Sequence, residues 1–172
     1  MKRNTTLSFL FSAFFLLLIA GKANAQVPYT VYLTNDSSTA TTYAFDIWVK
    51  ANNANDVMNL ANIQFGIGVN PAIRPAGSTT TVAFSGSSFT ATQVPTSIVY
   101  NATTNFINIA ARANPGCGSG TNITGAGTPC VNPGVKFGRI TLTNSLPLAS
   151  GSKPNLTLNF TAASGKTACV LS

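Results

Sequence analysis

Side chains that can transfer a proton are scarce in this sequence. Its 172 residues contain no histidine and no glutamate, and its only acids are Asp36, Asp46 and Asp56. General acid–base catalysis depends mostly on His, Glu, Asp, Lys, Tyr and Cys, and a Ser-His-Asp triad cannot form without histidine. The aspartates follow one another at positions 36, 46 and 56, a spacing that does not favour a paired-carboxylate glycosidase. We therefore expect no catalytic residues and no enzyme activity.

The three cysteines predict a disulfide rather than a metal site or a reactive thiol. Cys117 and Cys130 lie within residues 114–134, a segment rich in Gly and Pro. In an exported, oxidised chain these two would form a bond that limits the freedom of the loop. Three cysteines allow three single bonds, however, and Cys169 is left over. Zinc would find only cysteines and aspartates as ligands, and the aspartates lack the spacing of a calcium loop. We expect no metal and no cofactor.

An aromatic pair is the main candidate for ligand binding. Trp48 is the only tryptophan, and strand alternation places it and Tyr32 on the outward side of two predicted strands. If these strands are neighbours, the two rings form a platform that stacks on a sugar ring, while the amides of Gln64 and Asn70 read its hydroxyls. The same placement is typical of an aromatic pair that only stabilises a sheet, or of a surface that a loop or another domain covers. The structural alternatives stay open.

Two glycines suggest a second surface. Gly66 and Gly68 face outward on one predicted strand, where missing side chains would leave a flat patch that a partner protein could approach closely. Glycines at such positions also accommodate sheet coiling or a covering loop.

Short runs of alternating apolar and polar residues predict the strands that position these groups. In residues 42–50, Tyr43, Phe45, Ile47 and Val49 face one way and the residues between them face the other. The predicted strands are residues 31–34, 42–50, 60–70, 80–84, 97–100, 105–111, 137–143, 155–161 and 167–171. About nine strands at this spacing, with almost no helix, predict an all-β sandwich.

The inward positions of these strands predict the hydrophobic core. The expected core residues are Val31, Leu33, Phe45, Ile47, Val49, Ile63, Phe65, Ile67, Val69, Ile107, Ile109, Ile140, Leu142, Leu156, Leu158 and Phe160. Phe137 and Ile140 cannot share a face of a regular strand, and Gly138 between them predicts a β-bulge.

The first 25 residues have the pattern of a signal peptide. A basic head at 1–3 precedes an apolar run at 7–20, which is too short to span a bilayer. The small residues at 23–25 then suit a signal peptidase. We expect residues 1–25 to be removed and residues 26–172 to form one β-sandwich domain. The product would be secreted, extracellular or on the cell surface of a bacterium, with no membrane insertion after signal removal.

The charge of the chain does not point to nucleic acid. The formal net charge is +7, and three cations lie in the signal peptide. The remaining seven cations face three aspartates, for a net charge of +4, and most of them are scattered singly. Nucleic-acid binding would need a basic stripe, so we expect no nucleic-acid partner.

Several segments in order resemble the cohesin-like module found near the amino end of large bacterial surface proteins exported by the type IX pathway. They are residues 31–35 (VYLTN), 42–50 (TYAFDIWVK), 60–73 (LANIQFGIGVNPAI), 106–112 (FINIAAR), 139–144 (RITLTN) and 155–161 (NLTLNFT). The resemblance implies a nine-stranded jelly-roll sandwich, related to cohesins and carbohydrate-binding modules, without catalysis. Such proteins carry further domains and a sorting domain. Because this chain stops at Ser172, we expect either an amino-terminal fragment of a larger protein or a chain not exported beyond the outer membrane.

Composition and resemblance together predict a non-catalytic recognition or adhesion module. Its partner would be an extracellular polysaccharide, bound by Trp48 and Tyr32, or an extracellular protein docked on a sheet face. The alternative is a passive spacer that holds another domain away from the cell.

Overall fold

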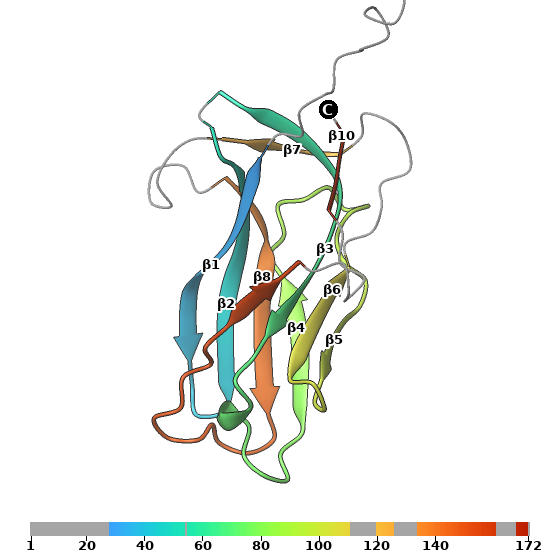
Figure 1. Cartoon of the computed structure of the whole chain (residues 1–172). Coiled ribbons are helices and arrows are strands. Elements are labelled where there is room, and N and C mark those ends of the chain that lie inside the picture. Colours follow the sequence, from blue (N-terminus) through green and yellow to red (C-terminus); the bar gives the residue numbers. More distant parts are fainter. Residues whose placement is uncertain (1–27, 54, 111–119, 126–133, 161–167, 172) are drawn as a thin grey trace, which may run out of the picture.

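The computed structural model describes residues 28–53, 55–110, 120–125, 134–160 and 168–171 (Figure 1). The regular secondary structure of this part of the chain is β-strand, apart from one turn of 3-10 helix at Pro71–Ile73. The predicted signal peptide and the predicted Cys117–Cys130 bond lie outside the described residues. Cys169 lies in the last strand, and its pairing stays open.

The strands form two antiparallel sheets whose apolar faces meet. The strands of the described part are β1 (Tyr29–Ser38), β2 (Thr42–Ala51), β3 (Val57–Gly68), β4 (Thr80–Ser85), β5 (Ile98–Asn101), β6 (Phe106–Ala110), β7 (Thr121–Thr124), β8 (Val135–Asn144), β9 (Thr157–Asn159) and β10 (Ala168–Leu171). The first sheet has the order β1-β2-β8-β4, and Figure 1 shows these strands side by side in one layer. The second sheet is built around β3. The fold is an all-β sandwich, as the alternating runs predicted.

The long strand β3 has different partners along its length. Its first residues pair with β7 and β10, and its last residues pair with β6 and β9. Each predicted strand has a counterpart in the structure. Sequence alternation missed β7, because Ile123 is the only large apolar residue among its four. The jelly-roll connectivity of the cohesin-like family stays a prediction.

Side chains from the two facing sheets form one hydrophobic core. The largest fully buried side chains are Phe45, Phe65, Phe137, Ile47, Met58, Leu60, Ile63, Ile67, Ile107, Ile109, Ile123 and Ile140. Burying each of them stabilises the fold by about 1.5–3 kcal/mol. Leu33, Leu156 and Leu158 are only partly buried.

The prediction that Phe160 belongs to the buried core is wrong. Its exposed fraction is 38%. Phe160 follows β9, which pairs with β3 over only three residues, so no ladder holds this side chain between the sheets. Its ring still contacts Phe65, with 5.6 Å between centroids.

The predicted bulge in β8 is confirmed. The register between β2 and β8 shifts after Ile47: Ile47 pairs with Gly138, and Trp48 pairs with Lys136. Phe137 is therefore an extra residue, and Phe137, Gly138 and Ile140 are all buried. A bulge of this kind lets two successive residues face the same side.

Candidate ligand-binding face

The surface of the β1-β2-β8-β4 sheet that points away from the core carries the predicted aromatic pair. Phe45, Ile47 and Val49 of β2 are completely buried. Since side chains alternate along a strand, Asp46 and Trp48 between them must point to the opposite side. We call this side, with the corresponding residues of β1, β8 and β4, the outer face.

Two rows of side chains cross the outer face. In the aromatic row, Tyr32 of β1 lies opposite Trp48 of β2, which lies opposite Lys136 of β8. The two strands are therefore neighbours, which is the condition for an aromatic pair, and both residues are half-buried. Residues directly opposite in an antiparallel pair have Cβ atoms about 4.5–5.5 Å apart. The two aromatic side chains therefore lie next to each other on neighbouring strands.

The second row is polar. Thr34, Asp46, Arg139 and Ser85 lie opposite one another in β1, β2, β8 and β4. This polar row is the next outward-facing row beside the aromatic row, because its members are two residues away along β1 and β2. A stacking surface and a line of hydrogen-bonding groups therefore share one face.

The bulge in β8 puts two cations on this face. Lys136 and Arg139 are three residues apart, so a regular strand would point them to opposite sides. The extra residue Phe137 corrects the alternation, and Lys136 and Arg139 both contact the carboxylate of Asp46. The bulge predicted around Gly138 was the one signal in the sequence that could have brought these two cations to one face.

Asp46 is the centre of a charged network. Its side chain is 6% exposed, and its Oδ1 accepts from Lys136 Nζ at 3.0 Å and from Arg139 Nη1 at 2.8 Å. Its Oδ2 accepts from Asn35 Nδ2 at 2.9 Å. Arg139 also donates through Nη1 to the carbonyl of Asn35 at 3.2 Å and through Nη2 to Ser37 Oγ at 2.7 Å. The network joins β1, β2 and β8.

The local backbone of β1 aims one of these donors. Asn35 has a φ of 51°, a left-handed conformation that asparagine tolerates better than most residues. It lies where the register between β1 and β2 shifts, between Thr34 and Ser37. This irregularity lets the amide of Asn35 reach Asp46.

The network holds Asp46 in its charged form. Burial by itself raises the pKa of Asp46, but hydrogen bonds from Asn35, Arg139 and Lys136 outweigh it, so that the pKa lies below its ordinary value. Such an ionised carboxylate, with both oxygens occupied, is poorly suited to act as a general acid.

Trp48 presents carbon atoms to the solvent. Its Nε1 is buried and has no hydrogen-bond partner in the part of the chain that the structure describes. Solvent therefore reaches the indole only at its carbon atoms, which are the atoms that stack against an apolar ring face.

The structure separates the two predicted amides from the aromatic pair. Gln64 belongs to β3 in the other sheet, and its neighbours Ile63 and Phe65 are fully buried, so Gln64 points away from the core on the far side of the sandwich. Alternation predicts that a side chain faces outward, but it does not predict which sheet carries it. Gln64 and Trp48 therefore do not form one site.

Asn70 has a structural role instead of the predicted role in binding. Its Nδ2 donates to the carbonyl of Lys153 at 2.8 Å, and its Oδ1 accepts from the backbone N–H of Ala72 at 3.0 Å. The second bond caps the Pro71–Ile73 helix. Both polar atoms of the amide are therefore used within the fold.

Side chains cover the two glycines that suggested a protein-docking patch. A Cβ on Gly66 would lie 1.8 Å from Cε1 of Phe106, and a Cβ on Gly68 would lie 2.5 Å from Oγ1 of Thr157. The space above the glycines is occupied by the neighbouring strands β6 and β9. The alternative interpretation, in which these glycines make room for a covering group, is the one that agrees with the structure.

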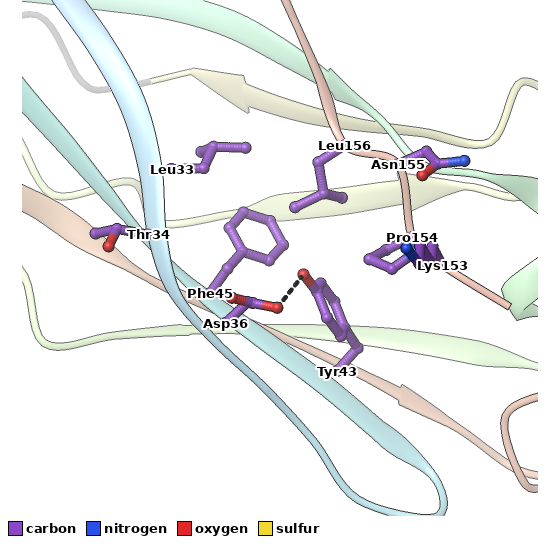
Figure 2. A pocket seen from close by; sticks show the side chains of 9 residues that line it. All are labelled: Leu33, Thr34, Asp36, Tyr43, Phe45, Lys153, Pro154, Asn155 and Leu156. Carbon is purple, nitrogen blue, oxygen red and sulfur yellow. Dashed lines mark hydrogen bonds between the residues drawn. The ribbon is translucent and has the colours of Figure 1, made fainter. Parts of the chain in front are cut away.

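A cavity of 530 Å³ lies at the edge of the sandwich, between β1 and the segment that leads into β9. Figure 2 shows Leu33, Phe45 and Leu156 at one part of it, and Tyr43 with its hydroxyl toward Asp36 at another. The Tyr43 hydroxyl donates to Asp36 Oδ2 at 3.5 Å.

Burial, with the nearby charge of Asp36, raises the pKa of Tyr43 to about 12. A neutral phenol held this way is a hydrogen-bond donor rather than a base, and the sequence did not predict this cavity.

We compared the chain with models of known protein families and with curated protein sequences. It matches none of them. The resemblance to cohesin-like modules therefore stays a prediction, and the function must be argued from the outer face itself.

Two further observations concern metals and membranes. Among the described residues, no group of three or more His, Cys, Asp or Glu side chains is placed to hold a metal ion. The described part also contains no helix that is long and apolar enough to cross a membrane.

Proposed function

We propose that this protein is a non-catalytic, secreted recognition module that binds an extracellular polysaccharide through its outer face. The observation that carries the proposal is the position of Tyr32 directly opposite Trp48, beside a polar row that contains Asp46 and Arg139. Recognition of sugars needs a surface that stacks on the ring and nearby groups that bind hydroxyls, and the outer face supplies both kinds of group.

The size of the aromatic surface suits a chain of sugars. Neighbouring strands lie about 4.8 Å apart, which is close to the length of one sugar unit. Successive rings of a polysaccharide that crosses the strands would meet Tyr32, then Trp48, then Lys136, because these residues are opposite one another.

A non-catalytic role is supported by the state of the acid on this face. Both oxygens of Asp46 accept hydrogen bonds from its neighbours, and the lowered pKa keeps the group charged. Export by a signal peptide at 1–25, and membership of the cohesin-like modules of type IX surface proteins, are part of this proposal and are supported by the sequence patterns alone.

Retention of the purified chain on insoluble polysaccharides tests the proposal. We expect Trp48→Ala to abolish retention and Trp48→Phe to keep part of it, since phenylalanine still offers a ring face. Val99→Ala is the control, because Val99 is 57% exposed and lies on β5 of the other sheet. Melting curves confirm that each variant is folded. Equal retention by Trp48→Ala and the unchanged chain, or no retention on any polysaccharide, refutes the proposal.

A further inference from the structure

The outer face has more positive than negative charge around its aromatic pair. Lys136 lies opposite Trp48. Lys50 lies two residues beyond Trp48 in β2. Arg139 is next to Lys136 on the face, across the bulge, and pairs with Asp46. Asp36 lines the edge cavity instead, and Asp56 lies beyond the end of β2. Three cations therefore share this face with the single carboxylate of Asp46.

The charged side chains of this face offer hydrogen-bond donors rather than acceptors. An ammonium group has three N–H donors and a guanidinium has five, and neither accepts. Asp46, which could accept from a sugar hydroxyl, already receives bonds on both of its oxygens. The side chains of Lys136 and Arg139 are 23% and 29% exposed, so a ligand can reach part of each. A ligand that complements this face supplies acceptors and negative charge.

We infer that the polysaccharide bound by the outer face is anionic and carries uronic acid carboxylates. Its sugar rings would stack on Tyr32 and Trp48, and a carboxylate of the next unit would lie beside the ammonium of Lys136. Charge-assisted hydrogen bonds of this kind are stronger than those between neutral groups. The inference rests on the proposed function and adds the chemical class of the ligand.

A pair of polysaccharides that share a backbone and differ in charge tests this inference. Polygalacturonate carries a carboxylate on every unit, and its methyl ester has the same backbone without the charge. Affinity electrophoresis of the purified chain would measure binding to each. We expect the chain to bind polygalacturonate at least about tenfold more tightly than the ester, and to lose this preference as added salt screens the charges.

Two variants with the same change of charge locate the interaction. Lys136→Gln removes the cation beside Trp48, and Lys153→Gln removes an exposed cation at the edge cavity. We expect the first to reduce binding to polygalacturonate by roughly tenfold and the second to change it little, because a pair of exposed charges at a distance is screened. Melting curves check that both variants are folded.

The possible results separate the inference from the proposed function. Equal binding to the ester and to polygalacturonate would overturn the inference and leave polysaccharide binding in place. An equal loss in Lys136→Gln and Lys153→Gln would also overturn it, since the attraction would then depend on net charge rather than on the outer face. If the chain binds neither probe and is not retained on any insoluble polysaccharide, both the inference and the proposed function fail.

Discussion

Replacing Asp46 by asparagine tests the network that holds the outer face together. The substitution keeps the size of the side chain and removes its charge. Lys136 and Arg139 would then lose the carboxylate oxygen that both contact, at 3.0 and 2.8 Å. The two cations would remain next to each other without the acid between them, and we expect the free energy of unfolding to fall.

The size of the loss follows from the burial of the three groups. Removing one partner of a fully buried ion pair costs about 3–5 kcal/mol, and a hydrogen bond to a charged group contributes about 1.5–3 kcal/mol. Asp46 is nearly buried, but the two cations are 23% and 29% exposed and can turn toward water. We therefore expect a loss of about 2–3 kcal/mol. For a domain of this size, each kcal/mol lowers the melting temperature by about 2–4 °C.

The loss should depend on pH. The pKa of Asp46 is lowered in the folded chain, so its contribution to stability is present above the ordinary pKa of about 3.9 and disappears as the pH falls through the lowered value. We expect thermal unfolding followed by circular dichroism to show a large difference between Asp46→Asn and the unchanged chain near neutral pH. The difference should shrink in acid.

Asp56→Asn is the matched control for this experiment. Asp56 accepts from Asn53 Nδ2 at 2.7 Å, and no cation of the described residues forms a salt bridge with it. We expect Asp56→Asn to lower the free energy of unfolding by less than about 1 kcal/mol. If Asp46→Asn costs no more than Asp56→Asn, or costs as much in acid as at neutral pH, the network does not stabilise the sheet in the way we describe.

Three further predictions follow from the packing and the pKa values. Gly138→Ala should lower the free energy of unfolding, measured by chemical denaturation, by about 1–3 kcal/mol. The added Cβ would lie 2.2 Å from the ring of Phe84, which packs against the core. Gly66→Ala should lower the free energy of unfolding less in the same assay, since the ring of Phe84 packs against the core whereas that of Phe106 does not and can move toward solvent; an equal loss would contradict this. Ultraviolet titration should show Tyr43 ionising near pH 12, and the fold should lose stability above pH 10, where this phenol would ionise if the chain unfolded.

Local alternation was enough to predict most strands and one irregularity. The side chains of β2 alternate regularly between core and surface, so Phe45, Ile47 and Val49 were identified as core residues from the sequence. The bulge was also predictable, because Phe137 and Ile140 break the alternation around Gly138. The strand β7 was missed because a run of four residues with one apolar side chain has no recognisable period.

The composition of the site was less predictable because it depends on contacts between distant segments. Tyr32 and Trp48 came together because β1 and β2 are consecutive strands, which are usually neighbours. Gln64 was assigned to the same site only because it also faces outward, and the pairing of β3 with β6 placed it in the other sheet. The network around Asp46 needs β1, β2 and β8 at once, and no pattern within one strand reveals three partners.

The extra residue in β8 also adds a side chain to the core. Residues before Phe137 and residues after it follow opposite phases of the same two-residue repeat. Deleting Phe137 would leave Lys136 and Arg139 two residues apart, which places both on one face of a regular strand. The same deletion would remove a fully buried ring from the core, at a cost of about 3–5 kcal/mol. Related sequences without this residue can therefore keep the outer face, but only if another side chain fills the space of the Phe137 ring.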